Sequence, residues 1–394
     1  MLEAKRLNKA IVPKTLITHP SPANLQSTRL ALHANGDVSS CWVYIASGSR
    51  IYKLRIAMED SSVGRGKESL LIPEHSQVLE SSMVKRCPHR SEIQSIVLAE
   101  TESKNRSIFG SVDSYGHLIV SPLDASNTDG TTYSVSPRDY EIGEGSWAGL
   151  CFNPNQLSMA AVARSLCKSI DIYDQDIHLR TLRTLWHPSS LVFMGNSSES
   201  GSSMLVITEG SQTSSTTHQR GVPMSVWDLR VKENGGCVHR ISGSVGDILY
   251  AVSISSTGYI AAGGADRTVT IYDPRRWCAV SRWLHCSKYE ITRLAFSSVD
   301  PNYIYVQGVD YEVLCGQWRE SKKAFSFRGD SNWLGFSKVE NALKDKLQES
   351  TPNVVPIGIF WQDGVIRVAY LLLMFLRRII QTLKRSFGFL MHTK

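Results

Sequence analysis

The residues best suited to catalysis in this sequence match catalytic motifs only in part. Gly64-Arg-Gly-Lys67 approaches a phosphate-binding loop, but Ser61 and Glu68 stand where that loop needs a glycine and a hydroxyl. Ser165-Leu-Cys-Lys168 has the spacing of a Ser-x-x-Lys nucleophile, yet its companion motifs are absent and its neighbours predict a strand–turn–strand. The histidines are scattered. We therefore expect no enzyme, and no cofactor or metal site.

Two arginines stand in a pattern suited to recognition instead. Each follows a strand-ending aspartate by two positions, in Val226-Trp-Asp-Leu-Arg230 and in Ile271-Tyr-Asp-Pro-Arg275. Because the aspartate ends the strand, we expect the arginine to project from the edge of the fold. A projecting guanidinium pairs with a carboxylate or with backbone carbonyls across an interface. The alternative is that each arginine pairs with an aspartate of the neighbouring structural unit.

The elements that carry these arginines recur along the chain. Tyr259–Asp273 reads as two short strands joined by a Gly-Gly-Ala-Asp turn, and Lys168–Asp174 and Met224–Asp228 repeat its second strand. A degraded copy ends at Trp318. Asp228 to Asp273 and Asp273 to Trp318 are each separated by 45 positions. A period of roughly 40–45 residues with four short strands is the signature of a propeller blade.

In these repeated sequence segments the chain resembles the WD-repeat β-propellers, also called transducin-like proteins. The resemblance implies an all-β fold, a single seven-bladed propeller over residues 28–370, with six to eight blades compatible with the repeats. In that family a histidine before each blade and an aspartate in a later turn form structural hydrogen bonds, which implies the pairs His89–Asp113 and His285–Asp310. The structural blade residues implied are His89, Asp113, Tyr173, Asp174, His285, Asp310 and Trp318.

The arginine pattern resembles the Trp-Asp-x-Arg motif of a subset of this family. In that subset the motif docks the propeller on the adaptor of cullin-4 RING ubiquitin ligases, and the propeller recruits the substrate. The adaptor-docking candidates are Val226, Trp227, Asp228, Arg230, Ile271, Tyr272, Asp273 and Arg275.

Composition sets the class of partner and the compartment. The net charge of +7 is mildly basic, and no Lys/Arg run alternates with aromatic residues in the repeats, which argues against nucleic acid as the main ligand. None of the eight cysteines forms a Cys-x-x-Cys pair, so they read as buried thiols. The first nine residues have charges and no apolar centre, so we expect no secretory signal. The nucleus or the cytoplasm is the expected location.

The two ends and three insertions depart from the repeat. Within the N-terminal segment 1–27, residues 10–18 are expected to supply the outer strand that closes the ring. Residues 371–394 are expected to form a basic amphipathic helix that packs on the propeller or a partner, or lies on a membrane surface. The alternative is a variant C-terminus that replaces part of the last blade. The apolar run 368–376 is too short for a transmembrane span. The polar insertions at 59–90, 122–146 and 195–222 are expected to be loops.

Three functions fit the sequence, and all use the same fold. The first is a non-enzymatic scaffold for protein–protein interaction in a nuclear or cytosolic complex. The second is a substrate receptor of a cullin-4 ligase, which requires Arg230 and Arg275 to be exposed. The third is a peripheral membrane or trafficking adaptor that uses residues 371–394. Fold alone does not choose among them.

Overall fold

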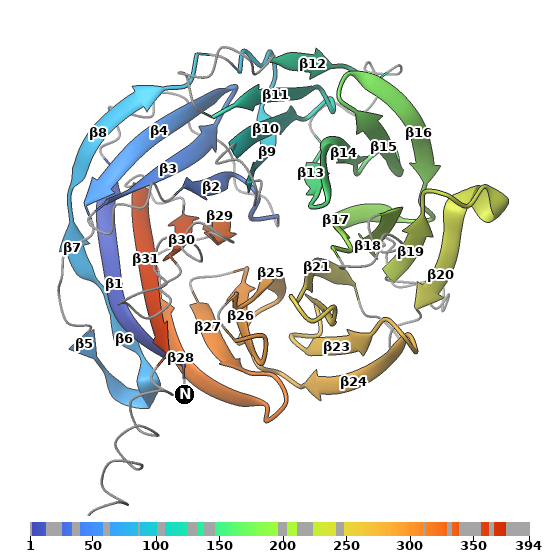
Figure 1. Ribbon diagram of the computed structural model, residues 1–394. Coiled ribbons are helices and arrows are strands. Elements are labelled where there is room, and N and C mark those ends of the chain that lie inside the picture. The colour runs from blue at the N-terminus through green and yellow to red at the C-terminus, as the bar shows by residue number, and fades with distance from the viewer. Residues whose placement is uncertain are drawn as a thin grey trace, which may run out of the picture.

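The computed structural model shows a ring of β-sheets around a central axis (Figure 1). The strands alternate in direction within each four-stranded sheet, and the first strand of each such blade lies nearest the axis (Figure 1). The residues described are 2–12, 26–33, 40–57, 64–85, 87–100, 107–123, 132–137, 146–195, 203–210, 224–241, 248–298, 300–309, 312–328, 333–338, 356–361 and 366–375.

The predicted all-β propeller is confirmed. Six four-stranded blades lie within the predicted range of six to eight, and a composite sheet occupies the remaining position in the ring. In chain order the first three blades are β2 (Leu30–His33), β3 (Ser40–Ser47), β4 (Arg50–Ala57) and β8 (Val78–Met83); β9 (Ile93–Glu100), β10 (Ser107–Asp113), β11 (Leu118–Pro122) and β12 (Tyr133–Val135); and β13 (Ala148–Asn153), β14 (Gln156–Arg164), β15 (Ser169–Asp174) and β16 (Ile177–Arg183).

The next three blades carry the best copies of the repeat. A short 3-10 turn, η4 (Glu233–Gly236), precedes the outer strand of the first of them. These blades are β17 (His187–Phe193), β18 (Met204–Gly210), β19 (Met224–Asp228) and β20 (Cys237–Ile241); β21 (Leu249–Ile254), β22 (Ile260–Gly264), β23 (Val269–Asp273) and β24 (Cys278–Trp283); and β25 (Ile291–Phe296), β26 (Tyr303–Gly308), β27 (Glu312–Gln317) and β28 (Lys322–Arg328).

The composite sheet joins the two ends of the chain. Its order is β29-β30-β31-β1-β7, and β1 pairs antiparallel with β31 from Leu2↔Phe375 to Val12↔Ile366. Such pairing removes an open edge and closes the ring. The strands are β29 (Trp333–Lys338), β30 (Pro356–Trp361), β31 (Ile366–Phe375), β1 (Leu2–Val12) and β7 (Glu74–Ser76).

The ends of the chain differ from the sequence expectation in their bounds. The closing strand is β1, which shares only residues 10–12 with the expected segment 10–18. At the other end β31 continues to Phe375, so residues 371–375 of the expected helical tail belong to a strand. Residues 376–394 lie outside the described residues. No helix in the described part of the chain is long and apolar enough to cross a membrane.

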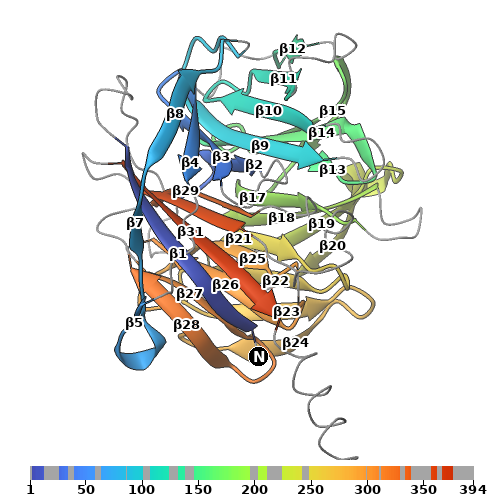
Figure 2. The same cartoon turned by 60° about the vertical axis from the view of Figure 1, so that its left-hand side comes forward.

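The three polar insertions contain strands that the sequence analysis missed. The insertion at 195–222 holds β18, and the one at 122–146 holds β12. The insertion at 59–90 holds β8 and an outer strap, which we define as residues 64–76 (Figure 2). The strap contains β5 (Gly64–Arg65), the 3-10 turn η2 (Lys67–Ser69), β6 (Leu71–Ile72) and β7.

The outer strap crosses the seam at which the ring closes. Its strand β7 pairs parallel with β1 at residues 8–10, and the bridge Leu70↔Ser326 joins it to β28 in the preceding blade. From the strap the chain enters β8, the outer strand of the first blade. One segment therefore touches the sheets on both sides of the closure.

The apolar core is divided into layers between neighbouring blades. One layer joins the β21–β24 blade to the β25–β28 blade and includes Trp283 and Trp318. Another joins the β13–β16 blade to the β17–β20 blade and includes Trp147 and Trp227. Burying a large apolar side chain contributes roughly 1.5–3 kcal/mol. Each layer is shared, so no blade buries its faces alone.

A short polar segment at the ring axis, Ser27–Arg29, connects the ends of several sheets. All three residues are buried. Their successive carbonyl oxygens accept hydrogen bonds from N–H groups of three different sheets: Ser27 from Phe336 at 3.2 Å, Thr28 from Ile96 at 2.9 Å and Arg29 from Ala46 at 3.0 Å.

The side chains of the Ser27–Arg29 segment reach further blades. The Thr28 hydroxyl donates to the Gln94 carbonyl oxygen at 2.7 Å and accepts from the Trp147 indole N–H at 3.2 Å. The Ser27 hydroxyl accepts from the Gln307 amide at 2.6 Å. These bonds join the segment to the blades that begin with β9, β13 and β25.

Arg29 is the one charged group of this segment. Its side chain is 1% exposed, forms an ion pair with Glu92 at 2.8 Å and donates to the side-chain oxygen of Gln94 at 3.2 Å. Burial lowers the pKa of Arg29, and the nearby Glu92 carboxylate acts in the opposite direction. A buried charge with one partner removed is strongly destabilising, so Arg29 ties the first two blades together.

Replacing Thr28 with valine tests the axial segment. Valine keeps the shape of threonine but leaves the Trp147 N–H and the Gln94 carbonyl without this partner. We expect the Thr28→Val variant to lose about 1–3 kcal/mol of unfolding free energy in urea. Thr132→Val, at an exposed position beside β12, serves as the control and is expected to change stability by less than about 0.5 kcal/mol. Equal stability of the two variants would contradict the role given to Thr28.

Candidate functional site: the arginine turns and the His89–Asp113 cluster

The turn that follows β19 holds Arg230 in a fixed position at the surface. Asp228 ends the strand, and its carboxylate accepts the Arg230 backbone N–H at 3.0 Å. The same carboxylate accepts from Arg230 Nε at 3.0 Å and from Nη2 at 2.8 Å, which is a two-pronged pair. The Arg230 side chain is nevertheless 56% exposed. The turn therefore presents a guanidinium whose direction is already set.

The ionisation state of the Asp228–Arg230 pair is fixed as well. The hydrogen bond from the Arg230 side chain lowers the pKa of Asp228, and the partial burial of the carboxyl offsets only part of that effect. Asp228 thus remains an acceptor over the physiological range. Asp228 accepts from Nε and Nη2 of the Arg230 guanidinium, and the rest of that group is exposed.

A second arginine, Arg180, supports this turn from the preceding blade. It extends from β16, and its Nη1 donates to the carbonyl oxygens of Val231 at 2.7 Å and of Leu229 at 3.3 Å. The sequence analysis missed Arg180 because no local pattern marks a bond between two blades. The turn that carries Arg230 is therefore held by its own blade and by its neighbour.

The aromatic and apolar members of the segment Val226–Arg230 belong to the core. Trp227 is 2% exposed, and its indole donates to the Ser225 hydroxyl at 2.8 Å. Ser225 in turn donates to the buried carboxylate of Glu209. Val226 is also buried. Of this first motif, Arg230 is exposed, Leu229 is half-buried and the Asp228 side chain is 11% exposed.

The turn that follows β23 repeats this arrangement with one difference. Asp273 accepts the Arg275 backbone N–H at 2.9 Å, and the Arg275 side chain is exposed. Among the residues that the structure describes, no side-chain hydrogen bond or ion pair is found for Arg275. Ile271 and Tyr272 are buried in the core. Arg275 is therefore less constrained than Arg230.

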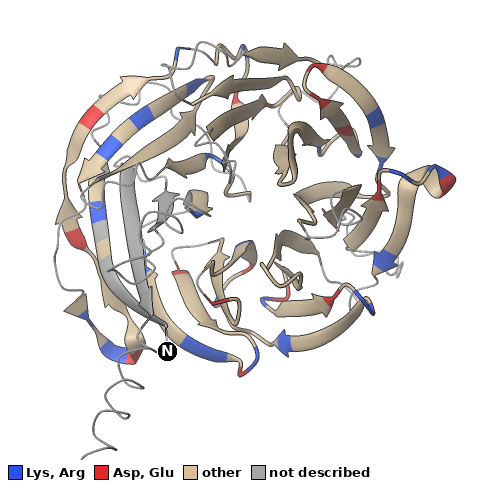
Figure 3. Cartoon of the chain, in the orientation of Figure 1, with Lys and Arg blue, Asp and Glu red and all other residues tan. Residues whose placement is uncertain are grey.

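Both arginines lie on one edge of the ring. Each occupies the connection between the third and the fourth strand of its blade, and neighbouring blades repeat the same strand order. Basic residues mark the turn between β23 and β24 (Figure 3). The next blade adds Arg319 after β27, stacked 4.6 Å from the centre of the Trp318 ring. We call the turns that carry Arg230, Arg275 and Arg319 the arginine turns.

The remaining structural candidates have different environments. Tyr173 is buried against the ring of His178 at a centroid distance of 5.5 Å, and Asp174 ends β15 half-buried. Trp318 is 2% exposed, and its indole donates to the Pro301 carbonyl at 2.8 Å. His285 is exposed and contacts Arg267 at 3.4 Å. Its expected partner, Asp310, lies outside the described residues.

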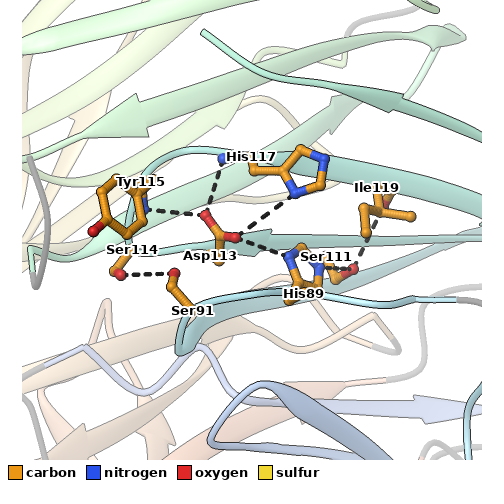
Figure 4. Close-up of polar contacts among 8 residues, drawn as sticks. All are labelled: His89, Ser91, Ser111, Asp113, Ser114, Tyr115, His117 and Ile119. Carbon is orange, nitrogen blue, oxygen red and sulfur yellow. Dashed lines mark hydrogen bonds and ion pairs between the residues drawn. The ribbon is translucent and has the colours of Figure 1, made fainter. Parts of the chain in front are cut away.

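The structure brings His89 and Asp113 together inside the β9–β12 blade (Figure 4). His89 Nδ1 lies 3.2 Å from Asp113 Oδ2, and the other ring nitrogen lies 2.8 Å from the Ser111 hydroxyl. His89 and Asp113 are both buried. The pair connects the approach to β9 with the turn after β10.

A third member of this cluster, His117, was missed by the sequence analysis. It lies four positions after Asp113, and its Nδ1 is 3.7 Å from the same Oδ2 (Figure 4). The other carboxylate oxygen, Oδ1, accepts the backbone N–H groups of Tyr115 and His117, each at 3.1 Å. The spacing Asp113-x-x-x-His117 across a Gly-containing turn was the available signal.

Opposing effects act on the Asp113 carboxyl. Burial raises its pKa, but hydrogen bonding by the His117 and His89 imidazoles outweighs burial and holds the pKa of Asp113 well below its usual range. The carboxyl is therefore ionised in the folded protein. In the described part of the chain, these are the three residues whose potential metal-ligand atoms gather within 4.8 Å of one another.

Comparison with known proteins gives the fold alone. No protein-family model matches the sequence, and no curated protein matches it. Among solved structures, the crystal structure of Chaetomium thermophilum Raptor is similar, with a TM-score of 0.60 at 10% sequence identity. The match covers 93% of this chain and 30% of that chain. This chain thus corresponds to less than a third of its structural neighbour.

The depressed pKa of Asp113 predicts how stability depends on pH. A carboxyl whose folded pKa lies below its unfolded value of about 3.9 contributes stability above that value and loses it as pH falls. From pH 5 to pH 3 we expect the intact chain to lose about 1 kcal/mol more unfolding free energy than the Asp113→Asn variant does.

Urea unfolding at the two pH values measures this difference. Asp176→Asn, in an exposed turn, is the matched control and should keep the pH dependence of the intact chain. If Asp113→Asn also kept it, the Asp113 carboxyl would not be the group that titrates.

Proposed function

We propose that the protein is a non-enzymatic interaction scaffold of the WD-repeat type, which holds partner proteins on the edge of the ring that carries the arginine turns. The observation that supports this most strongly is the pair of exposed arginines at the same position in neighbouring blades. Arg230 is oriented by Asp228 and by a turn that Arg180 stabilises. Arg275 projects from the equivalent turn.

Preorganisation explains why such a surface suits a protein partner. Holding a side chain in its bound direction before contact reduces the entropy lost on binding. Arginine is enriched at the energetic centres of protein interfaces because its planar fork pairs with carboxylates and carbonyls. The buried tryptophan and tyrosine of each motif fix the strand from which the arginine turn begins.

The proposed location is the nucleus or the cytoplasm. All eight cysteines are free thiols, and several of them are buried. Burial raises the pKa of Cys286 to about 12, so this thiol stays protonated and unreactive. Free thiols of this kind suit a reducing compartment.

A second candidate is a substrate receptor of a cullin-4 ligase. The observation that favours it is that Arg230 pairs within its own blade and stays exposed, rather than being buried in an ion pair between blades. Exposure of both arginines is the condition that this function requires. In this case the partner on the arginine turns would be the ligase adaptor, and the substrate would bind elsewhere on the ring.

Affinity capture with matched variants tests both candidates. The intact chain is compared with an Arg230→Ala, Arg275→Ala double variant and with a control, Arg50→Ala, Arg183→Ala, which removes two exposed arginines elsewhere. Circular dichroism shows that all three are folded. We expect partner proteins recovered in stoichiometric amounts with the intact chain and the control, and at least about tenfold less with the arginine-turn variant.

The identity of the lost partner separates the two candidates. Loss of the cullin-4 adaptor, repeated with the purified adaptor, would support the ligase receptor. Loss of other proteins with no adaptor present would support the general scaffold. Equal recovery of every partner by the three proteins would contradict a role for the arginine turns.

A further inference from the structure

We propose that the protein carries a second docking surface, which takes a partner-protein segment that combines a bulky apolar side chain with an acidic one. We call this surface the leucine patch and define it as Leu166, Lys168, Leu185 and Trp186. These residues lie in the turn between β14 and β15 and in the connection from β16 to β17 (Figure 1). The inference does not depend on the arginine turns, which lie in other connections of the ring.

Two hydrogen bonds join the two segments that carry the leucine patch. The Thr184 backbone N–H donates to the Lys168 carbonyl oxygen at 2.9 Å. His187 Nδ1 donates to the Ser165 carbonyl oxygen, also at 2.9 Å. The turn after β14 and the connection after β16 are therefore held together at both of their ends.

The two leucines lie inside these joined segments and face solvent. Leu166 is 54% exposed and Leu185 is 53% exposed, and the neighbouring Trp186 is half-buried. Single exposed apolar residues are normal on a protein surface, whereas an apolar group that is contiguous marks an interaction site. The leucine patch therefore offers an apolar contact for a bulky side chain of a partner.

The backbone beneath the leucine patch is fixed before a partner arrives. The Trp186 N–H donates to the carboxylate of Glu209 in the next blade at 2.9 Å, and the Thr184 hydroxyl donates to the Trp186 carbonyl oxygen at 2.7 Å. On the other segment, the Lys168 N–H donates to the Ser165 carbonyl oxygen at 3.2 Å. Because both segments are already ordered, binding loses little backbone entropy.

The charge at the leucine patch selects an acidic partner. Lys168 is the basic side chain of the patch, and its Nζ lies 5.9 Å from the centre of the Trp186 ring. Attraction to the ring face holds the ammonium beside the apolar surface, where a partner carboxylate can pair with it. The Glu209 carboxylate is buried and bonded to the Trp186 N–H, so it does not face the partner.

Charge also argues against two other occupants. Residues 376–394 of the chain contain five Lys and Arg residues and no Asp or Glu, so their charge has the same sign as Lys168. A membrane surface is less suited because stable peripheral binding needs an extended basic surface or a second anchor, and the patch offers one lysine. An acidic, apolar protein segment matches both features of the patch.

The leucine patch lies on the opposite edge of the ring from the arginine turns. In an antiparallel blade, the connection between the second and third strands and the connection to the next blade lie at one edge. The connection between the third and fourth strands, which carries each arginine turn, lies at the other edge. A partner on the leucine patch would therefore not compete with a partner on the arginine turns.

Peptide selection on the full chain tests the leucine patch. Short random peptides displayed on phage are selected on the intact chain, and the recovered sequences are synthesised with a fluorescent label. We expect them to carry a bulky apolar residue close to an aspartate or glutamate. In fluorescence anisotropy, a Leu166→Ser, Leu185→Ser double variant should bind them at least about tenfold more weakly than the intact chain. Lys168→Gln should also weaken binding and reduce its dependence on salt.

Two control variants separate this test from other effects. Leu284→Ser removes a leucine of another blade that is 59% exposed, and it should bind the peptides as the intact chain does. The Arg230→Ala, Arg275→Ala variant should also bind them normally, so failure of the arginine-turn proposal leaves this result unchanged. Circular dichroism shows that every variant is folded.

Several outcomes would overturn the proposal. One is equal binding of the peptides by the intact chain and the leucine double variant. Another is recovery of peptides without acidic residues, or of none that depend on the leucine patch. Flotation with phosphatidylserine vesicles gives the third: if the two leucine substitutions abolished vesicle binding and no peptide bound, the patch would be a membrane contact instead.

Discussion

Three successive peptide carbonyls at the ring axis are the constraint on which this propeller depends. Through Ser27, Thr28 and Arg29 the chain bonds to N–H groups of three different sheets, and the side chains of the segment reach further blades. A ring of sheets with only side-by-side packing would open at its weakest interface. The axial segment opposes this because opening any of these interfaces breaks buried hydrogen bonds, each costly to leave unmade.

The outer rim adds a second closure to the axial one. β1 completes the composite sheet with β31, and the outer strap crosses the same seam from β28 to the first blade. With the ring closed at the axis and at the rim, the turns between strands keep fixed positions. The turn that carries Arg230 then has a rigid support, so under the proposed function this side chain would lose little entropy on meeting a partner.

The sequence predicts the inner parts of the blades better than their edges. The third strands are readable because both of their faces are buried, as in β19, where all five residues are buried. Outer strands such as β8 are mostly exposed and show no apolar periodicity, so this strand looked like a polar loop. Ser27–Arg29 and Arg180 were missed for a related reason: each acts through contacts with other segments of the chain. His117 was missed although it lies only four positions from Asp113.

Hydrogen exchange of the full chain tests the central claim most directly. The N–H groups of Ala46, Ile96 and Phe336 belong to three sheets but bond to three adjacent carbonyls of the axial segment. If that segment closes the ring, all three should exchange through one shared opening and report the same free energy, close to that of global unfolding. Exchange at three different rates, each following its own blade, would contradict the account.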